Sequence, residues 1–306
     1  MTKKPASRGG SSAGEPLRTV ARGILAEARA ALENESRNDA EAVHNFRKAM
    51  KRWRALLRLL EPHLGDSGRR LRIAARDIAR ELSGPRDAQS ALNAIDDTLK
   101  HDASFSRASL RTIRKRVDEV RMQAESTTLT PELRTQMLAY LRRATLAADR
   151  WPVAQIGFDD IAERLTETYK RARRGLPDKW PETGAESLHE LRRRVIEHRY
   201  QMELVEPLWP RLGKLWVEET QRLRDRLGRY QDLVVLDCLT APHQLLARWR
   251  SKLAPLIAYR QAVHLAAAAR LGGRLFAERP KAFRRRLQAM WKARPGPGGN
   301  GLPPPR

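Results

Sequence analysis

The sequence predicts an all-α protein made of two related helical bundles. Three observations lead to this prediction: apolar residues recur every three or four positions, no stretch alternates with period two, and one basic segment occurs twice. The chain has 306 residues, which is enough for two domains or for one large domain with a substantial core.

The apolar spacing and the helix breakers together predict about ten helices. Breakers interrupt the helical pattern at Glu61-Pro62, Gly65, Gly84-Pro85, Trp151-Pro152, Gly175, Trp180-Pro181, Glu206-Pro207, Gly272-Gly273 and Pro280. Residues 1–16 and 294–306 are rich in Gly, Ser, Lys or Pro and poor in apolar residues that could pack, so both are predicted to be disordered tails.

The predicted duplication rests on two segments separated by a constant offset. Residues 43–64 read VHNFRKAMKRWRALLRLLEPHL, and residues 188–209 read LHELRRRVIEHRYQMELVEPLW. The identical pairs are His44/His189, Arg47/Arg192, Arg54/Arg199, Leu59/Leu204, Glu61/Glu206 and Pro62/Pro207. The same offset relates Asp87 to Asp232. We therefore expect repeat halves at about 17–156 and 157–293, one for each bundle.

The first copy places a row of basic residues along one side of a predicted helix. Its members are His44, Arg47, Lys48, Lys51, Arg52, Arg54 and Arg58, called the first basic face below. Phe46, Met50 and Trp53 follow a neighbouring apolar face at helical spacing. No Asp or Glu occurs between Glu41 and Glu61, so like charges repel along the face and an anionic ligand would offset them. A solvated surface helix is the alternative, and the recurrence in a second copy favours binding.

The second copy is less basic. His189, Arg192, Arg193 and Arg199, with the adjoining Arg194, form what is called the second basic face below. Ile196 and Glu197 stand where the first copy has Lys51 and Arg52, and Glu203 replaces Arg58. His198 matches Trp53 in position and either packs or joins the face.

The histidines and aspartates of the two copies admit two interpretations each. His44 and His189 would be core residues or, given the arginines three and ten positions later, phosphate contacts; we favour the second interpretation. Asp87 and Asp232 sit at the start of predicted helices, where a carboxylate either stabilises the helix end or orients an Arg or His of the basic faces.

Several classes of function find no support in the sequence. No phosphate-binding glycine loop is present, and the segment beginning His189-Glu190 lacks the second histidine of a zinc motif, so no metal or cofactor is expected. The single cysteine, Cys238, excludes an internal disulfide, fits a reducing cytoplasm and is expected in the core. Neither a secretory signal nor a membrane span is expected. Trp53, Trp216, Trp249 and Trp291 are also interpreted as core residues.

The overall charge points to an anionic partner. Sixty Lys and Arg against 36 Asp and Glu give a formal net charge of +24, and 48 of the 60 basic residues are Arg. Arg binds phosphate oxygens bidentately and keeps its charge in every environment, so the excess favours an oxyanion ligand.

These motifs resemble the CHAD family, the conserved-histidine α-helical domain. The two His/Arg helices are similar to the family's paired histidine helices, and LSGPRD (82–87) and LGRYQD (227–232) are similar to the segments that follow them. LFAERPKAF (275–283) with Trp291 resembles the family's usual ending, so the resemblance covers about residues 17–293.

The resemblance implies a pseudo-two-fold pair of bundles with a basic groove or channel between them that binds inorganic polyphosphate. It also implies association with polyphosphate granules in the cytoplasm. Some family members carry a triphosphate-tunnel (CYTH) domain with an ExExK strand; no such motif occurs here, so triphosphatase activity is not expected.

Two alternatives remain open at this point. The charge alone would suit a nucleic-acid-binding protein, although no helix-turn-helix or RNA-recognition motif is present, and non-specific nucleic-acid binding is compatible with either interpretation. A metal-dependent enzyme acting on polyphosphate or triphosphates would need clustered carboxylates, and the sequence offers only Asp87 and Asp232. We therefore expect a non-catalytic binding or scaffold protein.

Overall fold

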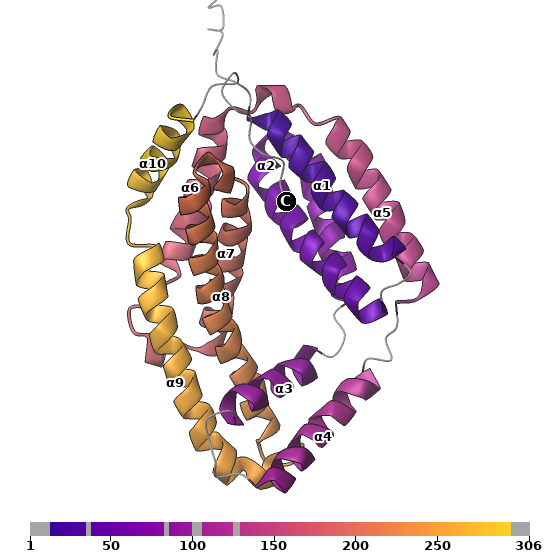
Figure 1. Ribbon diagram of the computed structural model, residues 1–306, viewed down its shortest axis with the longest axis vertical. Helices are drawn as coiled ribbons and strands as arrows, with labels where there is room; N and C mark the ends of the chain where they lie inside the picture. Colours follow the sequence, from indigo (N-terminus) through magenta and orange to yellow (C-terminus); the bar gives the residue numbers. More distant parts are fainter. Residues whose placement is uncertain (1–12, 35–37, 83–85, 100–105, 125–128, 295–306) are drawn as a thin grey trace, which may run out of the picture. The chain divides into compact units, whose positions relative to one another are not determined.

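The computed structural model describes residues 13–34, 38–82, 86–99, 106–124 and 129–294. Within these residues the chain forms ten α-helices and four short 3-10 helices, and no strand (Figure 1). The prediction of an all-α protein is confirmed.

The helices follow one another with short connections. The α-helices are α1 (Gly14–Glu33), α2 (Asp39–Glu81), α3 (Arg86–Leu99), α4 (Arg107–Ala124), α5 (Pro131–Asp149), α6 (Phe158–Arg174), α7 (Ala185–Glu203), α8 (Pro210–Leu239), α9 (Arg250–Leu275) and α10 (Pro280–Lys292). The 3-10 helices are η1 (Val153–Gln155), η2 (Trp180–Glu182), η3 (Glu206–Leu208) and η4 (Ala247–Trp249).

Most of the predicted breakers act as expected. In α2, the backbone leaves helical geometry at Gly65, whose φ of 52° lies in the left-handed region, three residues after Pro62. Trp151-Pro152, Gly175, Trp180-Pro181 and Glu206-Pro207 all fall between α-helices. Gly84-Pro85 lies outside the described residues.

The predicted break at Gly272-Gly273 is wrong, because α9 continues to Leu275. A Cβ atom at Gly272 would lie 2.8 Å from Cδ2 of Leu176. The residue is therefore small because η2 and the segment before it pack closely on α9, and the helix tolerates it.

The N-terminal helix starts inside the segment predicted as a tail. It begins at Gly14, while residues 1–12 lie outside the described part of the chain. The Ala13 N–H donates to the Ile156 carbonyl at 3.2 Å, and a Cβ at Gly14 would overlap the carbonyl of Val153. Gly14 thus allows the start of α1 to lie directly on η1.

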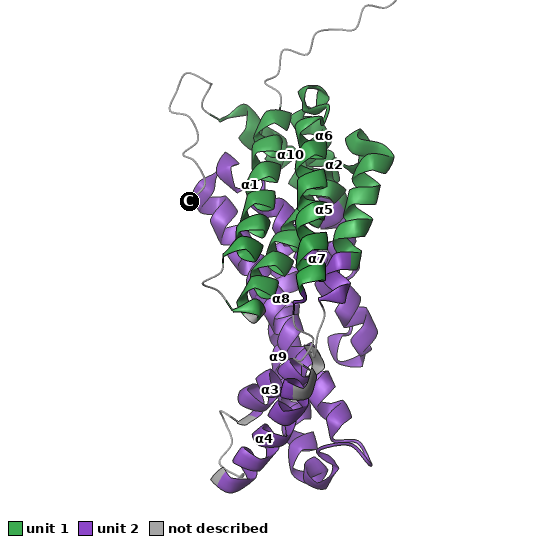
Figure 2. Ribbon diagram, turned by 90° about the vertical axis from the view of Figure 1, so that its right-hand side faces the viewer, with its two compact units in different colours: residues 1–77, 131–167, 281–306 green, residues 78–130, 168–280 purple. Residues whose placement is uncertain are grey.

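The chain divides into two compact units that interleave along the sequence (Figure 2). Unit 1 comprises residues 1–77, 131–167 and 281–306, and unit 2 comprises residues 78–130 and 168–280. These units do not follow the predicted halves 17–156 and 157–293, and the duplication, the pseudo-two-fold relation and the groove stay predictions.

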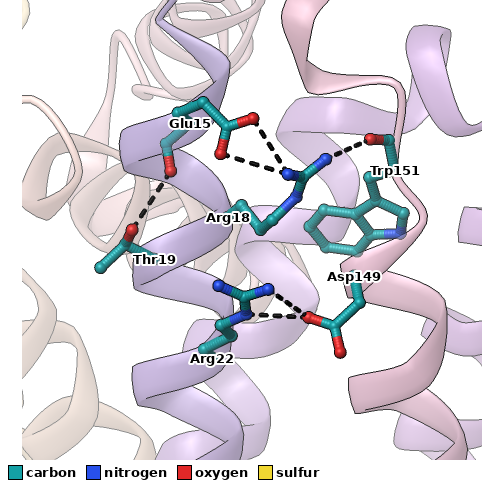
Figure 3. A network of polar contacts seen from close by, with 6 residues as sticks. All are labelled: Glu15, Arg18, Thr19, Arg22, Asp149 and Trp151. Carbon is teal, nitrogen blue, oxygen red and sulfur yellow. Dashed lines mark hydrogen bonds and ion pairs between the residues drawn. The ribbon is translucent and has the colours of Figure 1, made fainter.

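Unit 1 is held together by α1, α2 and α5. Figure 3 shows how arginines join α1 to the end of α5: Arg18 donates to the Trp151 carbonyl at 2.7 Å and pairs with Glu15, and Arg22 pairs with Asp149 at 2.7 Å. This arrangement fixes Trp151, whose ring stacks on Trp53 of α2 at a centroid distance of 5.5 Å. The packing of α1 and α5 therefore determines where α2 lies within unit 1.

Unit 2 has its own core, formed by α3, α4, α8 and α9. Helix α8 packs against α7, α9 and α3, and α3 packs against α4. The buried side chains of the cluster are Ala91, Ala94, Ile95, Ile113, Val117, Leu233, Leu236, Leu246, Leu253 and Ile257. Burial of this many aliphatic side chains is the main stabilising contribution to unit 2.

Two expectations about core residues need correction. Cys238 is exposed, because Leu233 and Leu236 take the buried side of α8 and leave Cys238 on the outside. Of the four tryptophans only Trp53 is fully buried. Trp216, Trp249 and Trp291 are half-buried.

Candidate functional site

The first basic face lies on α2, in unit 1. His44, Lys48 and Lys51 are exposed, and Arg47, Arg52, Arg54 and Arg58 are half-buried. The apolar face of the same helix is inaccessible to solvent, since Phe46, Met50 and Trp53 are each 0% exposed. The predicted division of α2 into an apolar side and a basic side is confirmed.

The buried side of α2 is fixed by a polar contact as well as by packing. Trp53 Nε1 donates to the Tyr140 hydroxyl at 2.7 Å, and that hydroxyl donates to the Leu71 carbonyl at 2.9 Å. Burial raises the pKa of Tyr140, although the hydrogen bond from Trp53 and the charges of Arg143 and Arg54 act to lower it. Tyr140 is therefore neutral, and the charge of Arg54 lies close enough to act on it.

One residue of the first basic face has an acidic partner on another helix. Arg52 forms an ion pair with Glu27 of α1, an acid that the sequence of α2 alone does not reveal. The absence of acids from this segment therefore does not mean that its charges lack partners, as Arg52 shows. The α2 segment 44–58 still contains six Lys and Arg and no Asp or Glu of its own.

The second basic face lies on α7, in unit 2, and most of its arginines pair with glutamates of the same helix. Arg193 and Arg194 both contact Glu190, at 3.3 and 3.2 Å. Arg199 pairs with Glu203 at 2.8 Å. His189 is half-buried. The segment 189–203 contains four arginines and three glutamates, so its charges largely cancel.

Arg192 is held differently, against the neighbouring helix α8. A Cβ atom at Gly228 would lie 3.2 Å from Nη2 of Arg192, so the guanidinium occupies the space that a side chain would fill. Gly228 belongs to the segment LGRYQD (227–232). Because Gly228 has no side chain, the guanidinium of Arg192 can pack directly against α8.

His198 packs in the core and does not join the second basic face. Its side chain is 0% exposed and lies among Tyr169, Phe276 and Trp216, with centroid distances of 5.6 to 6.4 Å. Its Nδ1 lies 3.4 Å from the Thr168 hydroxyl. Burial lowers the pKa of His198 to about 3, so the ring is neutral at physiological pH.

The predicted placement at a helix start is confirmed for Asp87 and wrong for Asp232. Asp87 lies in the first turn of α3, and its side chain is outside the described part of the structure. Asp232 lies well inside α8, which continues to Leu239, so its placement at a helix start is wrong. The suggested role in orienting an Arg or His stays a prediction for both.

A cluster that the sequence analysis did not identify involves His264. This histidine of α9 is fully buried and lies 2.7 Å from Asp97 of α3. The two residues are 167 positions apart, so no local spacing could reveal the contact. A basic residue one helical turn before the histidine, Arg260, was the only signal available in the sequence.

The described residues contain neither a metal-binding cluster nor a helix that could span a membrane. Among the described residues, no group of three or more His, Cys, Asp or Glu is arranged to hold a metal ion. No described helix has an apolar stretch of the length and hydropathy that crossing a bilayer requires.

Comparison with known families now decides the family of the chain. The CHAD domain family matches residues 17–241, which is most of the sequence. The chain belongs to the CHAD family. The histidine of each basic face and the segments LSGPRD and LGRYQD lie inside this match.

Solved CHAD structures share the fold at low sequence identity. The CHAD domain from the plant Ricinus communis aligns with a TM-score of 0.55 and 20% identity, covering 93% of each chain. PptA from Streptomyces chartreusis aligns with a TM-score of 0.59 and 18% identity, covering 92% of this chain and 100% of that one. No curated protein sequence matches the chain. Because the alignments cover 93% and 92% of this chain, the structural similarity extends beyond the end of the family match at residue 241.

Proposed function

We propose that this CHAD protein binds inorganic polyphosphate, and that the first basic face makes the strongest contacts. The observation that carries the proposal is the composition of α2: six Lys and Arg within fifteen residues, no acid on the same segment, and an apolar side that is fully buried. The association of the CHAD family with polyphosphate supports the choice of ligand.

The face is suited to a linear polyanion. Its half-buried arginines have restricted side chains and present guanidinium groups that hydrogen-bond phosphate oxygens in pairs. Lys48 and Lys51 are exposed and act as mobile point charges along the chain of phosphates. Binding releases condensed counterions, so the affinity falls steeply as the salt concentration rises. No bond is broken in this process.

The identity of the ligand is tested by comparing how tightly the wild-type protein binds three polyanions. Long-chain polyphosphate, single-stranded RNA and duplex DNA are matched in total charge, and their dissociation constants are measured at equal salt. We expect polyphosphate to bind most tightly. Equal or tighter binding of either nucleic acid would replace this proposal with the nucleic-acid alternative.

The test of the site uses charge reversal at exposed residues. Lys48→Glu with Lys51→Glu should weaken polyphosphate binding by about 100-fold or more, because two charge-assisted contacts are lost and repulsion is added. Lys115→Glu with Lys214→Glu is the matched control, since both lysines are exposed, on α4 and α8, and the change in net charge is the same. Similar losses in both variants would show that only the overall charge matters.

We propose further that the protein is not an enzyme and that it associates with polyphosphate granules. Incubation with polyphosphate and Mg²⁺ should release no phosphate above the rate of a blank; turnover would contradict the first statement. A fluorescent fusion in a polyphosphate-accumulating bacterium should co-localise with the granules, and the variant reversed at Lys48 and Lys51 should be diffuse. Diffuse wild-type fluorescence would contradict the second.

A further inference from the structure

A buried polar cluster connects three helices of unit 2. Asp97 of α3 accepts hydrogen bonds from Arg260 of α9 on both carboxylate oxygens, at 2.8 and 3.1 Å. The same carboxylate lies 2.7 Å from Nε2 of His264, one turn along α9. On the other side of the imidazole, Nδ1 lies 3.3 Å from Nη1 of Arg226 on α8. The cluster thus forms a continuous chain from Arg260 through Asp97 and His264 to Arg226.

The donors and acceptors of this chain define the state of the imidazole. Asp97 can only accept, because the hydrogen bonds from Arg260 and His264 and the charge of Arg260 outweigh the effect of burial and lower its pKa to about 2. Burial lowers the pKa of His264 more than the contact with Asp97 raises it, so the ring is neutral. Nε2 therefore carries the ring proton and donates a hydrogen bond to Asp97, while Nδ1 accepts the hydrogen bond from Arg226.

The charges of the cluster do not cancel at Arg226. Asp97 is balanced by Arg260, with side chains only 14% and 13% exposed, and the imidazole is neutral. Among the described side chains, no carboxylate lies within ion-pair distance of Arg226, and the adjacent Asp225 is bonded to Arg224 at 2.7 Å and Gln221 at 2.8 Å. Arg226 is a half-buried cation whose guanidinium is oriented by His264, with no carboxylate partner in the described part of the chain.

Such an arrangement is suited to bind an oxyanion. A guanidinium has five N–H donors, and within the described residues only one of those of Arg226 is used, in the contact with His264. Fixing the side chain in advance removes the rotamer entropy that an exposed arginine loses when it binds a phosphate. An anionic ligand would also supply the missing negative charge.

We infer that Arg226 is a phosphate-binding residue of unit 2, and that Asp97 and His264 are positioning residues that hold its guanidinium. This inference rests on the proposed polyphosphate binding and adds a site outside both basic faces. Unit 2 would then have a phosphate contact other than the arginines of α7 that pair with Glu190 and Glu203.

The first experiment removes the charge of Arg226 and keeps a hydrogen-bond donor at that position. Arg226→Gln retains an amide N–H toward His264, and we expect it to weaken polyphosphate binding about tenfold and to reduce the slope of log Kd against log salt concentration by about one. Arg222→Gln is the matched control: Arg222 lies one turn earlier on α8, is 69% exposed and pairs with Glu219. It should change the affinity less than twofold.

The outcomes separate this inference from the proposed function. If the wild-type protein does not bind polyphosphate, both are wrong. If the wild type binds but Arg226→Gln matches it in affinity and in salt slope, only the role of Arg226 is wrong and the cluster serves the fold alone.

The second experiment tests positioning through a double-mutant cycle. His264→Gln should weaken binding severalfold in the wild-type background and have no effect in the Arg226→Gln background, because the histidine acts through that arginine. Equal losses in both backgrounds would refute the positioning role. Since His264 is buried, ¹⁵N NMR of the unsubstituted protein gives a parallel measurement: the Nδ1 resonance should shift when polyphosphate is added, and an unchanged resonance would equally refute it.

Discussion

Helices α2 and α7 carry basic residues at matching positions, yet they differ in the acids that surround them. On α2, the segment 44–58 contains no acid, and Arg52 pairs with Glu27 of another helix, while on α7 Glu190 and Glu203 pair with three arginines of the same helix. The number of arginines is therefore a poor measure of a binding surface. The two faces differ in that the second carries acids within its own helix segment and the first does not.

The largest effect is expected when double charge-reversal variants of α2 and α7 are compared. Lys48→Glu with Lys51→Glu on α2 should weaken polyphosphate binding about 100-fold or more, as above, whereas Arg193→Glu with Arg194→Glu on α7 should weaken it less than tenfold, because those arginines already pair with Glu190. The measurement is the dissociation constant at one salt concentration, with circular dichroism to confirm helicity. Equal losses of affinity in the two double variants would show that the two basic faces contribute equally to binding.

The buried sides of the two helices should differ in their response to acid. His198 occupies the place on α7 that Trp53 has on α2, and its pKa in the folded protein, about 3, lies below the value of about 6.5 in the unfolded chain. The unfolded state therefore binds more protons between these values, so stability falls as the pH drops from about 6.5 toward 3, by about 2 kcal/mol at pH 5.

Urea denaturation of the wild type and of His198→Gln at pH 7 and pH 5 measures this contribution. Glutamine retains a hydrogen-bonding group near Thr168 and does not titrate, so the variant should lose less stability between the two pH values. The same pH dependence in both proteins would assign the effect to other groups.

A smaller effect should follow when the acids of α7 are removed. Glu190→Gln with Glu203→Gln releases three arginines and should strengthen polyphosphate binding about threefold, with a steeper salt dependence, because each pair is a surface or half-buried contact of modest strength. Glu119→Gln with Glu218→Gln removes the same charge near exposed lysines of α4 and α8 and serves as the control. An unchanged affinity in the α7 variant would mean that its arginines do not reach the ligand.

The smallest effect should come from Arg52 of the first basic face, which pairs with Glu27. Arg52→Gln should weaken binding less than twofold because Glu27 already satisfies that charge, while Lys51→Gln, next to it on the helix, should cost several times more. Titration of both variants at low salt compares them directly. A larger loss for Arg52 than for Lys51 would show that the ion pair opens when the ligand binds.

The helices and the basic side of α2 could be predicted because both depend on local spacing. Phe46, Met50 and Trp53 recur with the helical period and are buried, and Gly65 ends the first part of α2 as its position after Pro62 indicates. Local spacing failed at Gly272, where the glycine serves packing against Leu176 and leaves the helix intact.

The remaining features of the site depend on contacts between distant parts of the sequence. Glu27 and Arg52 are 25 positions apart, and Asp97 and His264 are 167 apart, so no pattern within one helix indicates either pair. Cys238 was misplaced for a related reason: its apolar neighbours indicate a core, but only the packing of α8 shows which of them face inward. Long-range pairing is what a single sequence leaves undetermined.

The interleaving of the two units has a consequence for the synthesis of the protein. Unit 1 draws on the beginning, the middle and the end of the chain, and Trp291 of α10 stacks on Phe158 of α6 at a centroid distance of 4.4 Å. Unit 2 is complete once residue 280 has left the ribosome, whereas unit 1 must wait for α10. During translation, the helix that carries the first basic face therefore belongs to a unit that stays incomplete until α10 has been synthesised.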